Sequence, residues 1–451
     1  MKFGLFLLPH FRNFDWRDVE TPNSEFRIPN SINYPWTEMP AVKPSPLEND
    51  ILLRGVWEGL GTPECHVTGG YVRDRLLGKT SVDLDLVLPG DIDAVAGPAR
   101  RLAARLDARA HVLGRDANRV WRIDCPEIKV ELWPLGALSL DEDIKRRDFS
   151  CNALFWQLPH GPLDDRICGR DDLRNGVIRA ISKQNLEGDP VRLVRAARFL
   201  AQLGGFSIDR QTASWIAGLA PAVAQAPKER VGQELIKLLA APGAEAGLRS
   251  LVVLGLLEPA APDGACCDHT WIEGNFSAIA RLSGFAPHPI AAAVRSAGDA
   301  ARLALLFRTW GCPDADTLTP FAWSRSDRRH GARAAALLER ALKTVEAPAA
   351  DRRSLIHIAG SAFPATVALA SADEPNLPWA RWWRVWRKRR ESLVNPEPLL
   401  SGKEIANILE IEPGSELGHA IDELTEAQIR NEVRTAASAR RWLRRRPKPS
   451  S

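Results

Sequence analysis

The sequence predicts an α/β head, with a mixed sheet of about five strands and covering helices, followed by a long all-helical remainder. Two observations support this prediction. Between about residues 51 and 135, apolar and alternating stretches of strand length recur between helical ones. After Arg179, the periodic stretches carry apolar residues at helical spacing and the strands stop.

The elements can be followed in order from residue 66. Five stretches read as strands, over residues 66–70, 82–88, 108–114, 119–125 and 129–135. A short helix, Val72–Leu77, is expected between the first two strands, and an amphipathic helix over residues 91–108 follows the second. Later helices are expected over residues 189–205, 229–241, 300–310 and 330–345.

These patterns divide the chain into five segments. Residues 1–50 are rich in Pro, Asn and charge without clear periodicity, so they are expected to form an N-terminal extension. The other segments are the head, a helical neck, a helical body and a basic helical tail, over residues 51–182, 183–260, 261–395 and 396–451. Pro396 and Pro398 mark the break before the tail.

Composition excludes several classes of protein. No apolar run approaches the length that spans a bilayer, so no membrane partner is expected. Pro9 and His10 interrupt the apolar start and no small-residue cleavage site follows, which predicts no secretory signal and a cytoplasmic protein. The seven cysteines form no CxxC pair, and Cys266, Cys267 and His269 are expected to pack rather than to bind zinc.

Net charge is only +4, but basic residues are concentrated in two places. Residues 430–451 carry eight basic residues and one acid, and residues 379–390 interleave four tryptophans with six basic residues. Aromatic and cationic side chains together suit a nucleic-acid backbone and its bases. A helix with a tryptophan core face and a solvated arginine face explains the second stretch equally well.

The stretch from Gly69 to Leu88 carries the chemistry. Asp83 and Asp85 share one face of a strand, about 7 Å apart along it, and they repel unless a cation lies between them. A hard ion such as Mg²⁺ meets that need and usually brings substrate phosphates. Gly69 and Gly70 allow backbone N–H groups to approach an anion, and Arg73 adds a forked cation for phosphate.

The chain resembles the class II tRNA nucleotidyltransferases and bacterial poly(A) polymerases. Five motifs occur in the family order: "GGYVRDRLLG" with "DLD", "EDIKRRDFSCNAL", "DDLRNGVIRAI", "GDPVRLVRAARF" and "KERVGQEL". The resemblance covers roughly residues 60–240 and implies transfer of nucleotides from CTP and ATP to an RNA 3′ end. The catalytic and metal residues that it implies are Asp83 and Asp85, holding two Mg²⁺ ions. The nucleotide-binding residues that it implies are Gly69, Gly70, Arg73, Arg147, Asp148, Asp189, Arg192, Arg195 and Arg198.

In the family, an aspartate and an arginine three residues later read the edge of the incoming base, and here they are Asp189 and Arg192. Such a pair bonds cytosine or adenine, because each offers an amino donor beside a ring-nitrogen acceptor. A competing interpretation is that Asp189 caps the helix that begins at Pro190. The family usually has Glu before this aspartate, where this chain has Gly188. Glu131, in "KVELW", is either a further carboxylate of the site or an ordinary exposed strand residue.

The tail, with "PGSELG", resembles that of CCA-adding enzymes and favours the tRNA 3′ end as partner. In the body, Arg308 and Thr309 stand where some relatives carry a paired His-Asp, so no phosphatase activity is expected.

The sequence therefore predicts addition of CMP and AMP to tRNA. Addition of CC alone, poly(A) synthesis and a catalytically inactive RNA-binding protein are the alternatives, and the oligomeric state is left open. Only five residues, Gly136 to Leu140, lie between Leu135, which ends the last strand, and Asp141, just before the second motif. Relatives that add all three nucleotides carry a flexible loop there.

Overall fold

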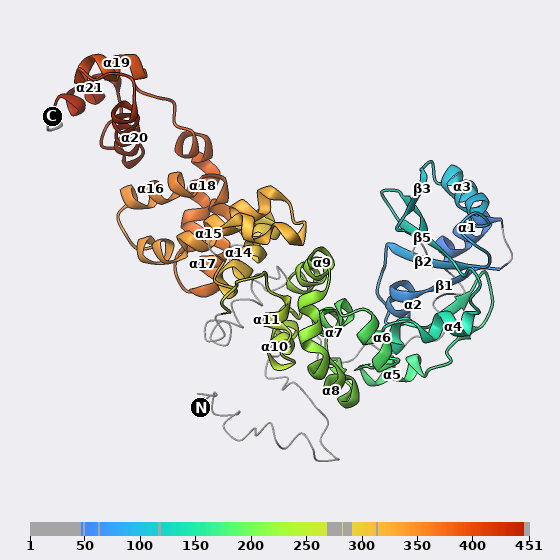
Figure 1. The fold of residues 1–451 in the computed structure, drawn as a ribbon. Helices are drawn as coiled ribbons and strands as arrows, with labels where there is room; N and C mark the ends of the chain where they lie inside the picture. The colour runs from blue at the N-terminus through green and yellow to red at the C-terminus, as the bar shows by residue number, and fades with distance from the viewer. Residues whose placement is uncertain are drawn as a thin grey trace, which may run out of the picture. The chain divides into compact units, whose positions relative to one another are not determined.

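The structure is a computed structural model that describes residues 50–61, 64–115, 119–267, 291–312 and 314–445, together with Leu47 and Leu282. Most of the expected N-terminal extension, the end of the tail and His269 lie outside the described residues. The chain divides into two compact units. Figure 1 labels the helices and strands along the chain. Unit 1 comprises Met1–Ala137, Phe149–Ala180 and Ser207–Ser214, and unit 2 comprises Leu138–Asp148, Ile181–Phe206 and Trp215–Ser451.

Unit 1 is built on one mixed sheet of seven strands. Its strands, in chain order, are β1 (His66–Thr68), β2 (Asp83–Leu88), β3 (Ala110–Leu113), β4 (Val120–Asp124), β5 (Lys129–Pro134), β6 (Phe155–Gln157) and β7 (Leu163–Asp164). In space the order is β3-β4-β5-β2-β1-β6-β7. Neighbouring strands are antiparallel except β2 and β5, which are parallel and place Asp85 beside Glu131.

All five predicted strands are present, but the predicted number was too small. The two additional strands, β6 and β7, are three and two residues long, and such short runs carry no readable alternation. The expectation that strands stop after Arg179 was also wrong. A second, two-stranded parallel sheet pairs β8 (Val177–Ile178) with β9 (Ser207–Ile208).

Helices α1 (Ile51–Leu60), α2 (Gly69–Leu76), α3 (Ala96–Arg105) and α5 (Gly169–Asn175) accompany the sheet in unit 1. The side chain of Asp50 links α1 to α2. Its carboxylate caps α1 through the backbone N–H groups of Leu52 and Leu53, accepts a 2.8 Å hydrogen bond from the Tyr71 hydroxyl, and lies 2.6 Å from Arg75 Nη2. These contacts hold α2, which begins at the glycines, in a defined place.

Unit 2 is helical, as the sequence predicts. Its described helices are α4 (Leu140–Lys145), α6 (Lys183–Gly188), α7 (Val191–Leu203), α9 (Lys228–Leu239), α10 (Ala244–Val253), α11 (Leu257–Ala260), α13 (Ala291–Ala297), α14 (Asp299–Thr309), α15 (Arg325–Thr344), α16 (Ala349–Ala359), α17 (Phe363–Asp373), α18 (Trp379–Val394), α19 (Gly402–Leu409), α20 (Ser415–Arg430) and α21 (Ala436–Arg444). Helix α8 (Arg210–Leu219) continues the chain from unit 1 into unit 2.

The expectation that no apolar run is long enough to cross a bilayer was too strict. Within the described residues, Ala349–Asp373 is such a run, with a mean hydropathy of 1.5 in its most apolar window, and 78% of that window is buried inside unit 2. It forms α16 and α17, and the side chains of α17 from Phe363 to Ala372 are all buried. These two helices therefore serve as core helices.

Helix α18 decides between the two interpretations of the tryptophan-rich stretch. Trp379, Trp382, Trp383 and Trp386 are all buried, and the rings of Trp383 and Trp386 stack on each other. The basic side chains of the same helix are exposed. The tryptophans therefore belong to the buried part of the helix surface and the basic side chains to its exposed part, as expected for a helix with a tryptophan core face.

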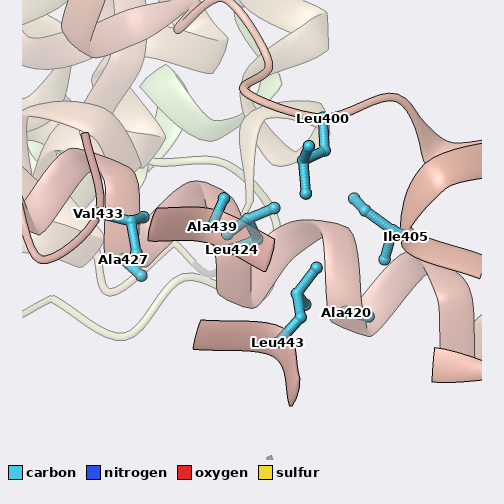
Figure 2. Packing of buried hydrophobic residues seen from close by; sticks show 8 residues of the cluster. All are labelled: Leu400, Ile405, Ala420, Leu424, Ala427, Val433, Ala439 and Leu443. Carbon is cyan, nitrogen blue, oxygen red and sulfur yellow. The ribbon is translucent and has the colours of Figure 1, made fainter. Parts of the chain in front are cut away.

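The tail has a small hydrophobic core of its own, shown in Figure 2. Its eight buried residues come from α19, α20, α21 and the segments beside them, and they are Leu400, Ile405, Ala420, Leu424, Ala427, Val433, Ala439 and Leu443. Helix α20 also contacts α16 through its C-terminus. Arg353 donates hydrogen bonds to the carbonyl oxygens of Ile429 and Arg430, and Asp351 pairs with Arg430.

Candidate functional site

The carboxylate pair lies at the start of β2. Asp83 is exposed and Asp85 is half-buried, whereas Leu84 and Leu86 between and after them are fully buried. This alternation confirms that the two aspartates share the open face of the strand. Val82, expected on the buried face, is instead 55% exposed, because β2 begins only at Asp83.

Gly69 lies against this pair and starts helix α2. Its φ is +70°, and a Cβ atom placed there would lie 2.8 Å from Oδ2 of Asp85. Thr68, the N-cap residue, makes no capping bond, because its hydroxyl donates to the carbonyl oxygen of Leu154. The first backbone N–H groups of α2 therefore receive no bond from the N-cap side chain, and they carry the positive end of the helix dipole.

Arg73 is held rigidly one turn into α2. Its Nη1 donates a 2.8 Å hydrogen bond to Oδ1 of Asn152, and its Nε donates a 2.8 Å hydrogen bond to Asp74. Arg73 is only 7% exposed. Asn152 was not singled out as a site residue, although it belongs to the motif "RRDFSCNAL", which was the available signal.

Glu131 lies beside Asp85 on the parallel neighbour β5, on the same face of the sheet. Its Oε1 accepts a 3.0 Å hydrogen bond from Arg122, which lies opposite it on the neighbouring strand β4. Arg122 also donates a hydrogen bond to Asp124. Hydrogen bonding to Asp124 raises the pKa of Arg122, and the charges of Glu131 and Asp83 add to this effect. Glu131 is thus an ion-paired residue next to the carboxylate pair.

The second motif, around α4, forms part of unit 2. Asp143 is buried, and its carboxylate accepts hydrogen bonds from Arg146 Nε at 2.8 Å and from Arg147 Nη2 at 2.9 Å. A capping box of Ser139 and Glu142 begins this helix. The predicted nucleotide-binding residue Arg147 is therefore oriented by Asp143, which the sequence analysis did not single out.

The arginine stripe of α7 meets acidic side chains from two other elements. Arg195 donates to Asp148 at 2.9 Å and to Glu234 at 3.0 Å, while Arg198 lies 2.6 Å from Glu234. Burial acts to lower the pKa of Arg195, but the charges of Glu234 and Asp148 outweigh it and raise the pKa. The resemblance implies that these arginines bind the nucleotide, and the structure gives them protein carboxylates as partners.

Asp189 does not cap α7. The N-cap residue is Pro190, no side-chain capping bond is formed, and Asp189 ends α6 in an extended conformation. Its two carboxylate oxygens instead accept hydrogen bonds from Arg230 on α9, at 3.0 and 2.7 Å. The competing interpretation of Asp189 as a helix cap is therefore wrong.

Arg192 lies beside Asp189, with its Nε 3.6 Å from Oδ2 of the aspartate. Its Nη1 donates to the carbonyl oxygens of Arg146 and Asn185, at 3.0 and 3.2 Å. The buried Nε has no hydrogen-bond partner among the described residues. Burial lowers the pKa of Arg192, only partly opposed by the charges of Asp148 and Asp189.

The predicted site residues fall into two groups, one in each unit. Unit 1 brings together Gly69, Gly70, Arg73, Asp83 and Asp85. The remainder lie in unit 2. There Asp189 lies beside Arg192, Arg195 pairs with Asp148 and shares Glu234 with Arg198, and Arg147 pairs with Asp143. Of the two cysteines that were expected to pack rather than to bind zinc, Cys267 is half-buried, whereas Cys266 is exposed and does not pack. Burial raises the pKa of the Cys267 thiol to about 11, which disfavours its thiolate.

Comparisons with known proteins agree with the fold and the motifs. Residues 65–179 match the family described as poly A polymerase head domain, and residues 205–267 match a probable RNA- and SrmB-binding site of polymerase A. The A-adding tRNA nucleotidyltransferase of Deinococcus radiodurans is 31% identical over 430 residues, covering 85% of this chain and 95% of that protein. The CC-adding tRNA nucleotidyltransferase of Thermus thermophilus is 29% identical and covers 83% and 92% of the two chains.

A solved structure supports the fold over most of the chain. The CCA-adding enzyme of Bacillus stearothermophilus in complex with CTP superposes with a TM-score of 0.66, at 22% identity, covering 89% of this chain and 97% of that one. The α/β head and the helical remainder predicted from the sequence are thus confirmed. The chain belongs to the tRNA nucleotidyltransferase and poly(A) polymerase family, and it is an enzyme of the nucleotidyltransferase class.

Proposed function

We propose that this enzyme extends the 3′ end of tRNA with CMP and AMP, using CTP and ATP and no nucleic-acid template. The observation that carries the proposal is the contact of Gly69 with Asp85, which joins a phosphate-binding helix start to a pair of metal-binding carboxylates. Transfer of a nucleotidyl group needs those two features side by side. The proposed place of action is the cytoplasm, where tRNA is processed.

Asp83 and Asp85 fit a Mg²⁺ site. Their oxygens are the hard ligands that this ion prefers, and one or two carboxylates with substrate phosphates are its usual ligand set. In the described residues, no three His, Cys, Asp or Glu side chains converge as a closed metal cage. Two bound Mg²⁺ ions would supply the positive charge that activates a 3′-hydroxyl and steadies the leaving pyrophosphate. Glu131 is engaged by Arg122, so we assign the metal to the two aspartates.

The protein groups around the carboxylates would bind and orient the nucleotide. The N–H groups at the start of α2 and the guanidinium of Arg73 would neutralise the triphosphate. In unit 2, Asp189 would accept a hydrogen bond from the amino group of cytosine or adenine, and Arg192 would donate to the ring nitrogen beside it. We propose that Arg147 contacts the ribose and phosphates, whereas Asp148, Arg195 and Arg198 position the helix that carries the base readers.

Arg192 and Arg73 should respond differently to substitution. Arg192→Ala is expected to relax discrimination against UTP and GTP, because its side chain would read the base edge. Arg73→Ala is expected to raise KM for all nucleotides alike, since it would remove a uniform contact to phosphate. Arg73→Lys is the matched control, because it keeps the positive charge and removes only the guanidinium group. Steady-state kinetics with each nucleotide measures both effects, and the same pattern in both variants would contradict the division of roles.

We propose that the basic surfaces of unit 2 bind the tRNA backbone. Helix α18 lines an open hollow of about 400 Å³ with Trp383, Arg384, Arg387 and Lys388. The hollow thus brings three cations of a single helix together, and such a group of cations attracts a phosphate backbone. The exposed arginines of α21 and its end, Arg441, Arg444 and Arg445, form a second basic surface on the tail.

Removing the tail after about residue 395 should weaken tRNA binding and reduce its salt dependence. Contacts between basic groups and phosphates release counterions, so their loss lowers the slope of binding against salt by about one per contact. The rate on a short minihelix that cannot reach the tail should barely change. Because truncation also uncovers Arg353 and Asp351, the variant with Arg441, Arg444 and Arg445 all changed to Ala is the cleaner measurement. Equal losses on tRNA and minihelix would indicate a folding role instead.

A direct assay tests the proposed function. tRNA transcripts that end at the discriminator base are incubated with Mg²⁺ and each labelled nucleotide, separately and together. Incorporation of CMP is expected, and incorporation of UMP and GMP is not. The rate of AMP incorporation separates CCA addition from the addition of CC alone. Binding of tRNA without incorporation of any nucleotide would favour the inactive RNA-binding alternative.

A further inference from the structure

We propose that Arg230 is a positioning residue for base recognition. Its guanidinium fixes the orientation of the Asp189 carboxylate, whereas Gly188, the residue before Asp189, has no side chain that could do so. The inference rests on the proposed function, because it assigns a partner to the carboxylate that would read the incoming base. Arg230 lies on α9, 41 residues away along the sequence.

The contact has the geometry of a fork. Nη1 of Arg230 donates to Oδ1 of Asp189 at 3.0 Å, and Nη2 donates to Oδ2 at 2.7 Å. Two parallel hydrogen bonds set the plane of the carboxylate as well as its position, which a single bond does not. The aspartate side chain is 22% exposed, so one side remains open to a ligand.

Other restraints on Asp189 are weak within the described part of the chain. Its backbone lies between α6 and α7, and it makes no capping bond that would fix its side chain. Arg192 Nε approaches Oδ2 only to 3.6 Å, longer than a hydrogen bond. The preceding Gly188 has no side chain, and a Cβ atom built there would meet nothing within 4 Å. The fork from Arg230 is therefore the contact that orients the carboxylate.

A fixed carboxylate is needed for discrimination. Each carboxylate oxygen has about two acceptor sites, so the fork leaves about one free on each for an amino group. Uracil and guanine place a carbonyl oxygen where cytosine and adenine place that amino group, and a fixed carboxylate repels it. A carboxylate free to rotate can turn away from the carbonyl oxygen and lose this penalty. Loss of Arg230 should therefore affect the choice of base more than the affinity for triphosphate.

The test compares Arg230→Ala and Arg230→Lys with the wild-type enzyme, on a tRNA transcript ending at the discriminator base. Lys237→Ala is the matched control, since Lys237 is an exposed cation two turns further along the same helix. Values of kcat and KM are measured for CTP and for UTP. The ratio of kcat/KM for CTP to that for UTP is expected to fall on the order of tenfold in Arg230→Ala, about the worth of a charged hydrogen-bonded contact. Arg230→Lys should lie between, and Lys237→Ala should match the wild type.

Each result decides the proposal. If the ratio of kcat/KM for CTP to that for UTP is unchanged in Arg230→Ala, the proposal is overturned, even where kcat/KM falls equally for both nucleotides. A lower ratio in Arg230→Lys supports the proposal even if the alanine variant does not fold, because lysine keeps the charge and loses the fork. Failure of the wild-type enzyme to incorporate any nucleotide is the separate outcome that rejects the proposed function, and this inference with it.

Discussion

Replacing Asp83 or Asp85 with alanine is expected to abolish incorporation of both CMP and AMP, with a loss of rate on the order of a thousand-fold or more. Both side chains lie on the open face of β2, and each would supply ligands that the other cannot replace. Asp83 is exposed and Asp85 is half-buried, so neither substitution removes a packed core group. The loss should therefore appear in the rate and not in the temperature of unfolding.

The affinity for tRNA should stay nearly unchanged in these two variants. The basic surfaces proposed to hold RNA lie in unit 2, whereas the two aspartates lie in unit 1. A filter-binding or fluorescence titration with tRNA therefore separates chemistry from binding. A variant that kept about a tenth of the wild-type rate would contradict the assignment of these residues to the metal.

Asp124 provides the matched control for removing an acid from this sheet. It ends β4, its side chain is 46% exposed, and it bonds Arg122 without lying beside Asp85 on β2. Asp124→Ala should change the rate by no more than a few-fold, since exposed ion pairs contribute about 0–1 kcal/mol. A loss as large as that of Asp83→Ala would show that charge on this face matters more than position.

The sequence predicted the strands that carry the site because those strands are long enough to show alternation. In β2, Leu84 and Leu86 alternate with the two aspartates, and that pattern alone placed the carboxylates on one face. Strands β6 and β7 were missed, since two or three residues show no period. Strand β6 depends on pairing with β1, and β7 on pairing with β6, which is information that the local sequence does not contain.

The partners of the site residues were the least predictable part. Arg192, Arg195 and Arg198 follow one another at a spacing of three residues, which places them near one another on a helix, but this spacing does not say which side chains face them. The answer comes from α9, where Glu234 pairs with Arg195 across 39 residues and Arg230 pairs with Asp189 across 41. Both α9 residues stand in the motif "KERVGQEL", so the sequence marked the segment without giving its contacts.

The choice of product depends on the short connection between β5 and α4. Gly136 forms a hydrogen bond with Gly90, at 2.8 Å, and Ser139 caps α4 in a capping box. Only Ala137 and Leu138 lie between these two bonded residues. A connection this short has few conformations, so it cannot act as a mobile lever that resets the pocket from cytosine to adenine. The two relatives described above bear different names, one A-adding and one CC-adding, and both names describe a single-base specificity.

We therefore expect CMP addition to be rapid and AMP addition to be slow or absent, which is the CC-adding alternative, with a separate enzyme completing the tRNA. The measurement uses three transcripts, ending at the discriminator base, after one C and after two Cs, with CTP and ATP supplied separately. AMP addition to the transcript ending in CC should be slower than CMP addition by on the order of a hundred-fold or more, since a pocket fixed for cytosine loses contacts worth about 3 kcal/mol when adenine enters. AMP addition at a rate matching CMP addition would contradict this expectation, because a pocket without a moving connection would then serve both bases. Addition of AMP alone would retain the single-base argument but assign the pocket to adenine.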